Sequence, residues 1–322
     1  MEKFFKFNPL LKQTIWGGGR IAPFKHLDTA AANIGESWEL SGVAGSETTV
    51  AGGPCGGMTT NSLVAEFGAE LLGRDNHLRF GGEFPLLVKF IDAAGDLSVQ
   101  VHPDDDTARR QGRGRGKSEM WYVMDSAPHA KMMIGLKRRI TPEEYRRLVA
   151  DDTICEAINV YDVKEGDCFY IPAGRIHSIG AGCFLTEIQQ TSDVTYRIYD
   201  FKRRDKNGNL RQLHTEEAAE AIDFSAHDDY RTLYTPARNR GVELVDCPHF
   251  NTAVYDLDEP MTLDYSGLDS FVILICVKGN GTITFDDGSQ TSLDAGETVL
   301  LPAATGALAV RGVVTFLETY IG

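Results

Sequence analysis

Three polar side chains alternate with apolar ones between positions 97 and 102, and one of them is a histidine. They are Ser98, Gln100 and His102. A period of two is typical of a β-strand, so these three side chains should share one face. Burying such groups without partners would cost about 1–3 kcal/mol each. A bound metal ion would give His102 a partner, whereas a hydrogen-bonded histidine on a solvated face would need none.

Two later segments add candidate metal ligands. A strand-like stretch at 117–123 carries Glu119, and a turn after an aromatic strand delivers His177. Together with His102 they form a nitrogen and oxygen set that suits Zn²⁺ with an open position for water or substrate. Fe²⁺ or Mn²⁺ would also accept this set. Gln100 is a candidate fourth ligand, but an amide is a weak ligand and could instead hydrogen-bond to a water on the metal.

The spacing around His177 matches a known superfamily motif. Four residues follow the pattern Gly-x5-Pro-x-Gly-x2-His: Gly166, Pro172, Gly174 and His177. This pattern resembles the second motif of the cupin superfamily. Three further runs occur in an order that resembles the zinc-dependent type I mannose-6-phosphate isomerases: 97–105, 117–119 and 187–197. The resemblance extends over nearly the whole chain and fits the short bacterial form, which lacks a large helical insertion.

The resemblance implies an aldose–ketose isomerase that interconverts mannose 6-phosphate and fructose 6-phosphate through an enediol, with one Zn²⁺ per chain. A cation beside the carbonyl oxygen lowers the barrier of such a reaction, and a base must reach the carbon-bound proton. Arg197 matches the family's catalytic arginine, which stabilises the enediolate with a permanent charge and a planar fork of donors. Glu187 and Asp193 match acidic positions of the pocket, where either could transfer the proton or hold Arg197 or a histidine in place. A metal-bound water is a third candidate base.

Other residues of the expected pocket are less specific. Ser98 and Lys117 match family positions near the phosphate or the sugar, where a charge-assisted contact is stronger than a neutral one. Lys89 is a lone charge in an apolar run and either neutralises a carboxylate or phosphate in the pocket or reaches outward to water. The glycine-rich stretch at 14–20 contains Trp16 and is not followed by a helical pattern, which argues against a phosphate-binding loop. In the family this stretch lies near the barrel.

Composition and charge limit the possible partners. The chain has 322 residues, 42% of them hydrophobic, and a net charge of −14 at pH 7. Nucleic acid and anionic membranes are therefore not expected partners, and a phosphorylated hexose needs a local positive patch. The first residues contain no apolar run long enough for a signal peptide or a membrane-spanning helix, and the six cysteines form no Cys-x-x-Cys pair. We expect reduced thiols, a cytoplasmic location, and a monomer or a homodimer.

The resemblance, together with a repeat, implies a mainly β fold of two cupin-like (jelly-roll) β-barrels with short helical insertions. Residues 164–173 recur at 294–303, 130 residues later, with glycine and proline at the same spacing. Repetition of one supersecondary unit indicates two barrels of one architecture, and chance similarity of two turns is the alternative. Ala307 occupies the position of His177, so the second copy should bind no metal. The expected domains are a catalytic cupin domain at 1–235 and a degenerate cupin-like domain at 236–322.

Helical insertions are expected at about 59–75 and 141–158, the second beginning with Thr141 as N-cap. Residues 104–117 are polar and basic, and they predict a flexible connection over the site. Two other functions stay open from the sequence. One is Fe²⁺-dependent oxygen chemistry on a cupin, and the other is a sugar-phosphate-binding sensor without turnover.

Overall fold

The chain folds mainly into β-strands. The computed structural model describes residues 1–204 and 207–322. The strands are β1 (Phe7–Asn8), β2 (Leu10–Gly18), β3 (Ile34–Ser41), β4 (Thr49–Val50), β5 (Leu86–Asp92), β6 (Val99–Val101), β7 (Glu119–Ser126), β8 (Lys131–Leu136), β9 (Ile158–Asp162), β10 (Cys168–Ile171), β11 (His177–Ile179), β12 (Cys183–Gln190), β13 (Tyr196–Tyr199), β14 (Gly241–Cys247), β15 (Phe250–Leu257), β16 (Met261–Asp264), β17 (Val272–Phe285), β18 (Gln290–Asp294), β19 (Thr298–Leu301) and β20 (Ala307–Tyr320). The helices are α1 (Ile21–Phe24), α2 (Thr60–Phe67), α3 (Ala69–Leu72), α4 (Arg74–Phe80), α5 (Asp105–Arg110), α6 (Pro142–Ala150), η1 (Ile154–Ala157) and α7 (Thr215–Ala221).

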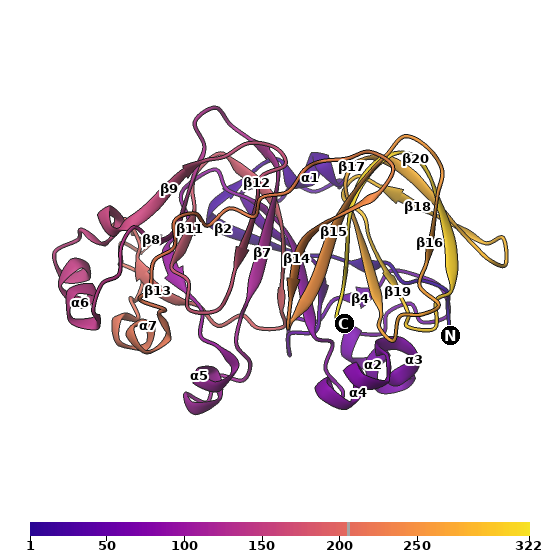
Figure 1. Cartoon of the computed structure of the whole chain (residues 1–322), viewed down its shortest axis with the longest axis horizontal. Helices are drawn as coiled ribbons and strands as arrows, with labels where there is room; N and C mark the ends of the chain where they lie inside the picture. Colours follow the sequence, from indigo (N-terminus) through magenta and orange to yellow (C-terminus); the bar gives the residue numbers. More distant parts are fainter. Residues whose placement is uncertain (205–206) are drawn as a thin grey trace.

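The first half of the chain forms two antiparallel sheets that pack against each other (Figure 1). One sheet has the order β10-β7-β12-β5-β3-β2, and the other has the order β13-β6-β11-β8-β9. Their shared core contains Ile91 and Trp121 from the first sheet and Ile134 and Ile179 from the second. Alternation of side chains along each strand brings one set of residues from each sheet into this interior.

The second half forms a seven-stranded sheet in which β14, β15, β20, β17 and β18 are successive neighbours, with β16 on β20 and β19 on β17. Its two long strands, β17 and β20, pair along their whole lengths, with a register shift between Cys276 and Lys278. Among the described residues no strand pairing closes any of these sheets into a barrel. The pair of closed barrels therefore stays a prediction.

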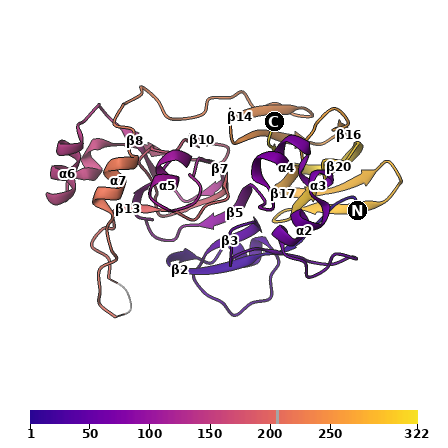
Figure 2. The same ribbon diagram turned by 90° about the horizontal axis from the view of Figure 1, so that it is seen from below.

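The two halves share one hydrophobic core, and segments from the start of the chain pack on the second half. Phe5 and Leu300 exchange two backbone hydrogen bonds of 2.8 and 2.9 Å. The helices α2, α3 and α4 lie beneath the second half in Figure 1, and the same helices appear beside its strands in Figure 2. Asn76 of α4 donates from Nδ2 to Ser270 Oγ at 3.1 Å and to the Ile321 carbonyl at 3.2 Å. The first and second halves are thus held together by the early helices.

The repeat predicted from the sequence is also a repeat in the structure. Gly166 and Gly296 both adopt a positive φ, 86° and 88°, in turns that lead into β10 and β19. β10 pairs antiparallel with β7, and β19 pairs antiparallel with β17 in the same way. A glycine is needed in both turns because a side chain at positive φ is strained.

Helix ends follow the capping residues. The prediction for Thr141 is confirmed, because its side chain accepts a hydrogen bond from the Glu144 backbone and α6 begins at Pro142. The connection at 104–117, predicted to be flexible, begins with a helix, α5. Asp104 accepts a hydrogen bond from the Thr107 amide at 2.6 Å and caps α5. None of the described helices is long and apolar enough to cross a membrane.

Candidate metal centre and substrate cavity

Three predicted metal ligands meet between the two sheets of the first half. His177 begins β11, where it faces Gln100 of β6. His102 follows the end of β6. Glu119 begins β7 in the opposite sheet, where it faces Ile171 of β10. The sandwich therefore brings two imidazoles from one sheet to a carboxylate from the other.

The geometry of this group suits a single metal ion. The ligand atoms of His102, Glu119 and His177 all lie within 4.8 Å of one another, and all three residues are buried. The distance from His102 Nε2 to Glu119 Oε2 is 3.6 Å, and that from His177 Nε2 to Glu119 Oε1 is 3.4 Å. Gln100 Nε2 lies 3.2 Å from His177 Nε2, so the fourth predicted ligand contacts the group at its edge.

Backbone carbonyls fix both imidazoles with Nε2 toward the group. His102 Nδ1 lies 2.7 Å from the Val194 carbonyl, and His177 Nδ1 lies 2.8 Å from the Arg175 carbonyl. A carbonyl can only accept, so each Nδ1 carries the proton and each Nε2 keeps its lone pair. Metal-binding histidines are commonly oriented by such a second hydrogen bond.

Three buried atoms of the group lack a hydrogen-bond partner among the described residues, and a cation would satisfy them. These atoms are His102 Nε2 and both carboxylate oxygens of Glu119, although Lys117 Nζ lies 2.9 Å from Oε2 as an ion-pair partner. Buried polar atoms are rarely left without partners, because each costs about 1–3 kcal/mol. The donor set of two nitrogens and a carboxylate is one that divalent transition metals accept. The residues present therefore fit a metal ion.

The protonation states of the two imidazoles also favour metal binding. Burial lowers the pKa of His102 well below its ordinary value, and Lys117 and the second histidine lower it further. Burial lowers the pKa of His177 to about 4. Both imidazoles are thus neutral near pH 7 and able to ligate. Burial and the charge of Glu187 raise the pKa of Glu119 to about 7, against the opposing effect of Lys117.

A second cluster of charges lies beside the metal ligands. Lys89 Nζ lies 2.9 Å from Glu187 Oε1, and Lys117 Nζ lies 3.6 Å from the same oxygen and 2.9 Å from Glu119 Oε2. Trp121 Nε1 donates to Glu187 Oε2 at 2.9 Å. Burial by itself would raise the pKa of Glu187, but Lys117 and Lys89 lower it to about 2. Of the two possibilities for Lys89, neutralising a carboxylate in the pocket is the one observed.

A cavity of about 350 Å³ opens beside these charges. Six of the residues predicted for the site line it: Ser98, Gln100, Lys117, Glu187, Asp193 and Arg197. Ser98 is buried with Oγ 3.5 Å from Gln100 Oε1, whereas Asp193 is exposed at the wall. Arg197 donates from Nη1 to the Gln212 carbonyl at 2.9 Å. The structure therefore brings every predicted site residue to the metal group or to the cavity beside it.

Eight further residues line this cavity without having been among the predicted site residues: Trp16, Glu36, Lys89, Ile91, Leu97, Ile179, Thr195 and Arg211. Lys89 carried a signal, as a lone charge in an apolar strand. Trp16 and its glycines were a visible motif, but nothing in the sequence indicated which side of it would face the substrate. Arg211 lies in a polar loop and carried no signal. Its Nε donates to Asp200 Oδ2 at 2.7 Å.

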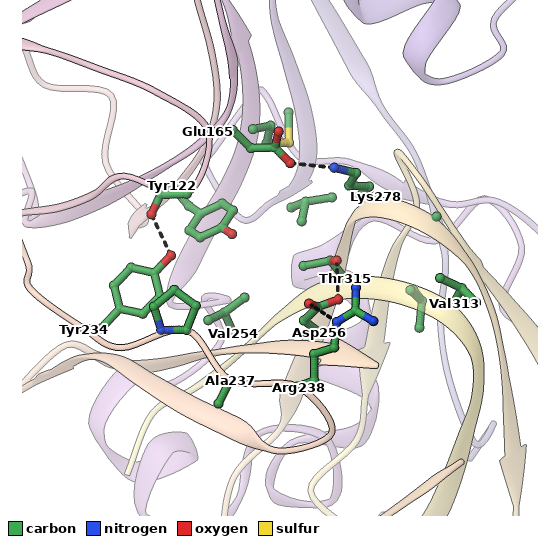
Figure 3. A pocket seen from close by; sticks show the side chains of 16 residues that line it. Tyr122, Glu165, Tyr234, Ala237, Arg238, Val254, Asp256, Lys278, Val313 and Thr315 are labelled. Carbon is green, nitrogen blue, oxygen red and sulfur yellow. Dashed lines mark hydrogen bonds and ion pairs between the residues drawn. The ribbon is translucent and has the colours of Figure 1, made fainter. Parts of the chain in front are cut away.

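A larger cavity, of about 520 Å³, lies between the two halves (Figure 3). Its wall includes Tyr122 and Tyr234, and the ion pair of Glu165 with Lys278 crosses it at 2.7 Å. Among the described residues the one group able to hold a metal is that of His102, Glu119 and His177, which is not part of this wall. The candidate metal group therefore lies beside the smaller cavity and not in the wall of the larger one.

Comparison with known proteins gives the family. Residues 4–133 match the model of the catalytic domain of type I phosphomannose isomerase, and residues 242–321 match the model of the cupin domain of mannose-6-phosphate isomerase. The probable mannose-6-phosphate isomerase GmuF of Bacillus subtilis is 31% identical over 97% of both chains. The chain belongs to the type I mannose-6-phosphate isomerase family. The resemblance found in the sequence is confirmed.

Other members of the family agree over similar lengths. The mannose-6-phosphate isomerase ManA of Bacillus subtilis is 31% identical over 95% of both chains. The crystal structure of the mannose 6-phosphate isomerase from Bacillus subtilis superimposes with a TM-score of 0.90 at 28% identity, covering 99% of this chain and 100% of that one. A phosphomannose isomerase from Salmonella typhimurium shares the fold, with a TM-score of 0.81 at 15% identity and coverage of 99% and 100%.

Proposed function

We propose that this protein is a metal-dependent isomerase that interconverts mannose 6-phosphate and fructose 6-phosphate through an enediol. The observation that carries the proposal is the group formed by His102, Glu119 and His177, which lies beside a cavity lined by lysines, arginines and carboxylates. The family relationship supplies the substrate, because the relatives named above are mannose-6-phosphate isomerases.

The proposed metal is Zn²⁺, one per chain, held by His102, Glu119 and His177 with Gln100 at the edge of the set. Two neutral imidazoles and a carboxylate are a common zinc set that leaves a position open. A bound zinc ion would polarise a sugar oxygen as a Lewis acid. Lys117, at 2.9 Å from Glu119, adds positive charge on the same side of the cavity.

The charged wall provides the remaining chemistry. Arg197 stabilises negative charge on the enediolate, since its guanidinium stays protonated although burial and Arg211 lower its pKa. Glu187 has both oxygens engaged, one by Lys89 and one by Trp121, and a pKa of about 2 makes it a poor base. We therefore assign Glu187 to holding the two lysines.

We then assign the transfer of the proton between C1 and C2 to Asp193, the exposed carboxylate of the cavity wall. Ser98 and Lys117 are assigned to binding the sugar phosphate. Around the cavity, Lys117, Arg197 and Arg211 supply the local positive charge that a phosphorylated substrate requires in a protein with a net charge of −14.

The test is a coupled assay of fructose 6-phosphate formation from mannose 6-phosphate, on chelator-stripped protein before and after Zn²⁺ is added. Turnover restored by zinc is the expected result. Binding of fructose 6-phosphate without turnover under any divalent metal would favour a sugar-phosphate sensor. Dioxygen consumption after loading with Fe²⁺ would favour the cupin oxygenase.

The wider organisation is proposed on the same basis. We infer two cupin-like jelly-roll barrels, with the catalytic domain at 1–235, its helical insertions at about 59–75 and 141–158, and a degenerate domain at 236–322. A cytoplasmic location, a monomer or homodimer, and the absence of nucleic-acid and membrane partners fit a sugar-phosphate isomerase with this acidic composition.

A further inference from the structure

The glycine-rich stretch at 14–20 takes no part in the proposed chemistry, yet it places Trp16 in the wall of the substrate cavity. Trp16 is 7% exposed and belongs to the same apolar cluster as Ile91, Leu97 and Ile179, which line the cavity with it. Part of the cavity wall is therefore apolar, and the rest carries lysines, carboxylates and arginines. A sugar has hydroxyl groups around its edge and C–H groups on its faces, so it matches a cavity of this kind.

The main chain around Trp16 is fastened to the end of β5 and the start of β12. The Trp16 carbonyl accepts hydrogen bonds from the amides of Ala94 at 2.9 Å and Gly95 at 3.0 Å. Arg20 donates from its amide and from Nε to the two oxygens of Asp92, both at 2.6 Å. Its Nη2 also donates to the Cys183 carbonyl at 2.7 Å. Asp92 is 1% exposed, whereas the Arg20 side chain is 32% exposed, so a buried carboxylate anchors a partly exposed arginine.

The glycines of the stretch differ in whether the surrounding atoms leave room for a Cβ atom. A Cβ at Gly18 would overlap the Asp92 carboxylate, and a Cβ at Gly35 of the neighbouring strand would overlap the Trp16 ring. A Cβ at Gly19 would meet nothing within 4 Å. Close approach of the backbone to Asp92 therefore requires glycine at position 18 and not at position 19. Alanine at these two adjacent positions makes a matched pair of variants.

We propose that Trp16 is a substrate-binding residue that packs against the C–H face of the hexose, and that Arg20 and Asp92 are positioning residues that hold it there. The proposal rests on the proposed function and names a part of the same site. Contact with the non-reacting face of the sugar holds C1 and C2 against the charged wall. A displacement of about 1 Å in such a site can cost about 100-fold in rate.

The test compares steady-state kinetics of the zinc-loaded enzyme with mannose 6-phosphate and with fructose 6-phosphate. Trp16→Leu should raise KM for both sugars by about 10-fold or more, and Trp16→Phe by less. Gly18→Ala should raise KM in the same direction, whereas Gly19→Ala should match the unsubstituted enzyme. Asp92→Asn should resemble Gly18→Ala, with the zinc content unchanged in every variant.

A matched control separates substrate binding from packing. Phe285→Leu shortens an aromatic side chain that is 4% exposed in the second half, so it should lower Tm and leave KM unchanged. If Trp16→Leu lowers Tm in the same way with KM unchanged, Trp16 is a core residue only and the proposal is overturned. If Gly18→Ala behaves like Gly19→Ala, the positioning role of Asp92 is overturned. Should Trp16→Leu fail to fold, Trp16→Phe and Gly18→Ala decide.

Failure of the proposed function is distinguishable from failure of this inference. If the unsubstituted protein shows no turnover, the isomerase proposal falls, and Trp16 is then tested by titrating fructose 6-phosphate while tryptophan fluorescence is recorded. A fluorescence change that is absent in Trp16→Phe supports the contact between Trp16 and the sugar. An equal change in both proteins, or no binding of the sugar phosphate at all, overturns it.

Discussion

Each half of the molecule has a buried glutamate at an equivalent position of its sheet. The side chains beside the two glutamates differ in charge. Glu187 of β12 faces Trp121 of β7 on one side and Lys89 of β5 on the other. Glu318 of β20 faces Leu274 of β17 and Ala253 of β15. The turns at Gly166 and Gly296 and the strands that follow them establish the equivalence.

The neighbours decide the charge of each carboxyl. Lys117 and Lys89 overcome the effect of burial and lower the pKa of Glu187 to about 2. Around Glu318 the partners are the hydroxyls of Tyr255 and Tyr265, and burial raises its pKa. Both halves therefore bury a carboxyl at this position, and Lys89 of β5 together with Lys117, which precedes β7, favours the ionised form of the one in the first half.

The metal ligands differ between the halves in the same way. Glu119 pairs with Ile171 in the first half, and the equivalent pair in the second half is Val272 with Leu301. His177 pairs with Gln100 in the first half, and the equivalent pair in the second half is Ala307 with Asp264. Glu119 and His177 thus have apolar counterparts in the second half.

The largest expected effect comes from removing one ligand of the first half. His177→Ala should lower metal affinity and turnover by about 100-fold or more, since loss of groups that merely orient a ligand already costs 10–100-fold. Metal content after dialysis and the coupled isomerase assay measure this. The reciprocal variant, Ala307→His, should bind no additional metal because Val272 offers no carboxylate. Retention of metal and activity by His177→Ala would place the metal elsewhere.

A smaller effect is expected from Lys89, which has an alanine as its counterpart in the second half. Lys89→Met leaves Glu187 buried with one ion-pair partner fewer, and it should destabilise the fold by about 3–5 kcal/mol. Urea unfolding at pH 7 measures the change. The double variant with Glu187→Gln should recover part of the loss, because the unpaired charge is gone. An equal loss in the single and double variants would contradict the importance of this pair.

The sequence indicated the three residues of the candidate metal group and the repeat, but it did not indicate the side chains that surround them. His102, Glu119 and His177 each lie at or next to a strand whose alternation could be seen, and the glycine and proline of the repeat recur at fixed spacing. The pairing of Lys89 with Glu187 depends on strand register across a sheet, which local sequence does not specify. Arg211 reaches the cavity from a loop, for which no period exists.

The helical parts show a similar limit. Thr141 and Pro142 predict the start of α6. The polar residues at 104–106 predict a flexible connection, but Asp104 is the N-cap of α5. The sequences of α2, α3 and α4 do not indicate that these helices pack against the second half. It depends on tertiary contacts such as that of Asn76 with Ser270.

The smallest expected effect concerns Glu318, whose pKa is raised by burial. The folded state holds the proton more tightly than the unfolded chain does. Its contribution to stability is therefore complete below the unfolded pKa and is lost as the pH rises through the folded pKa. Glu318→Gln keeps the shape without the charge, so it should be more stable than the unsubstituted protein at pH 8, by about 0.5–2 kcal/mol.

At pH 4 the advantage of Glu318→Gln should be small, because the glutamate is then protonated in the fold. Urea unfolding at both pH values measures the difference, with Glu187→Gln as the matched variant of the first half. The sign should reverse there, because the lysines favour an ionised Glu187, so its replacement should cost more at pH 8 than at pH 4. The same pH dependence in both variants would show that the neighbours do not set the charge. The contrast between the halves would then have to come from backbone surroundings alone.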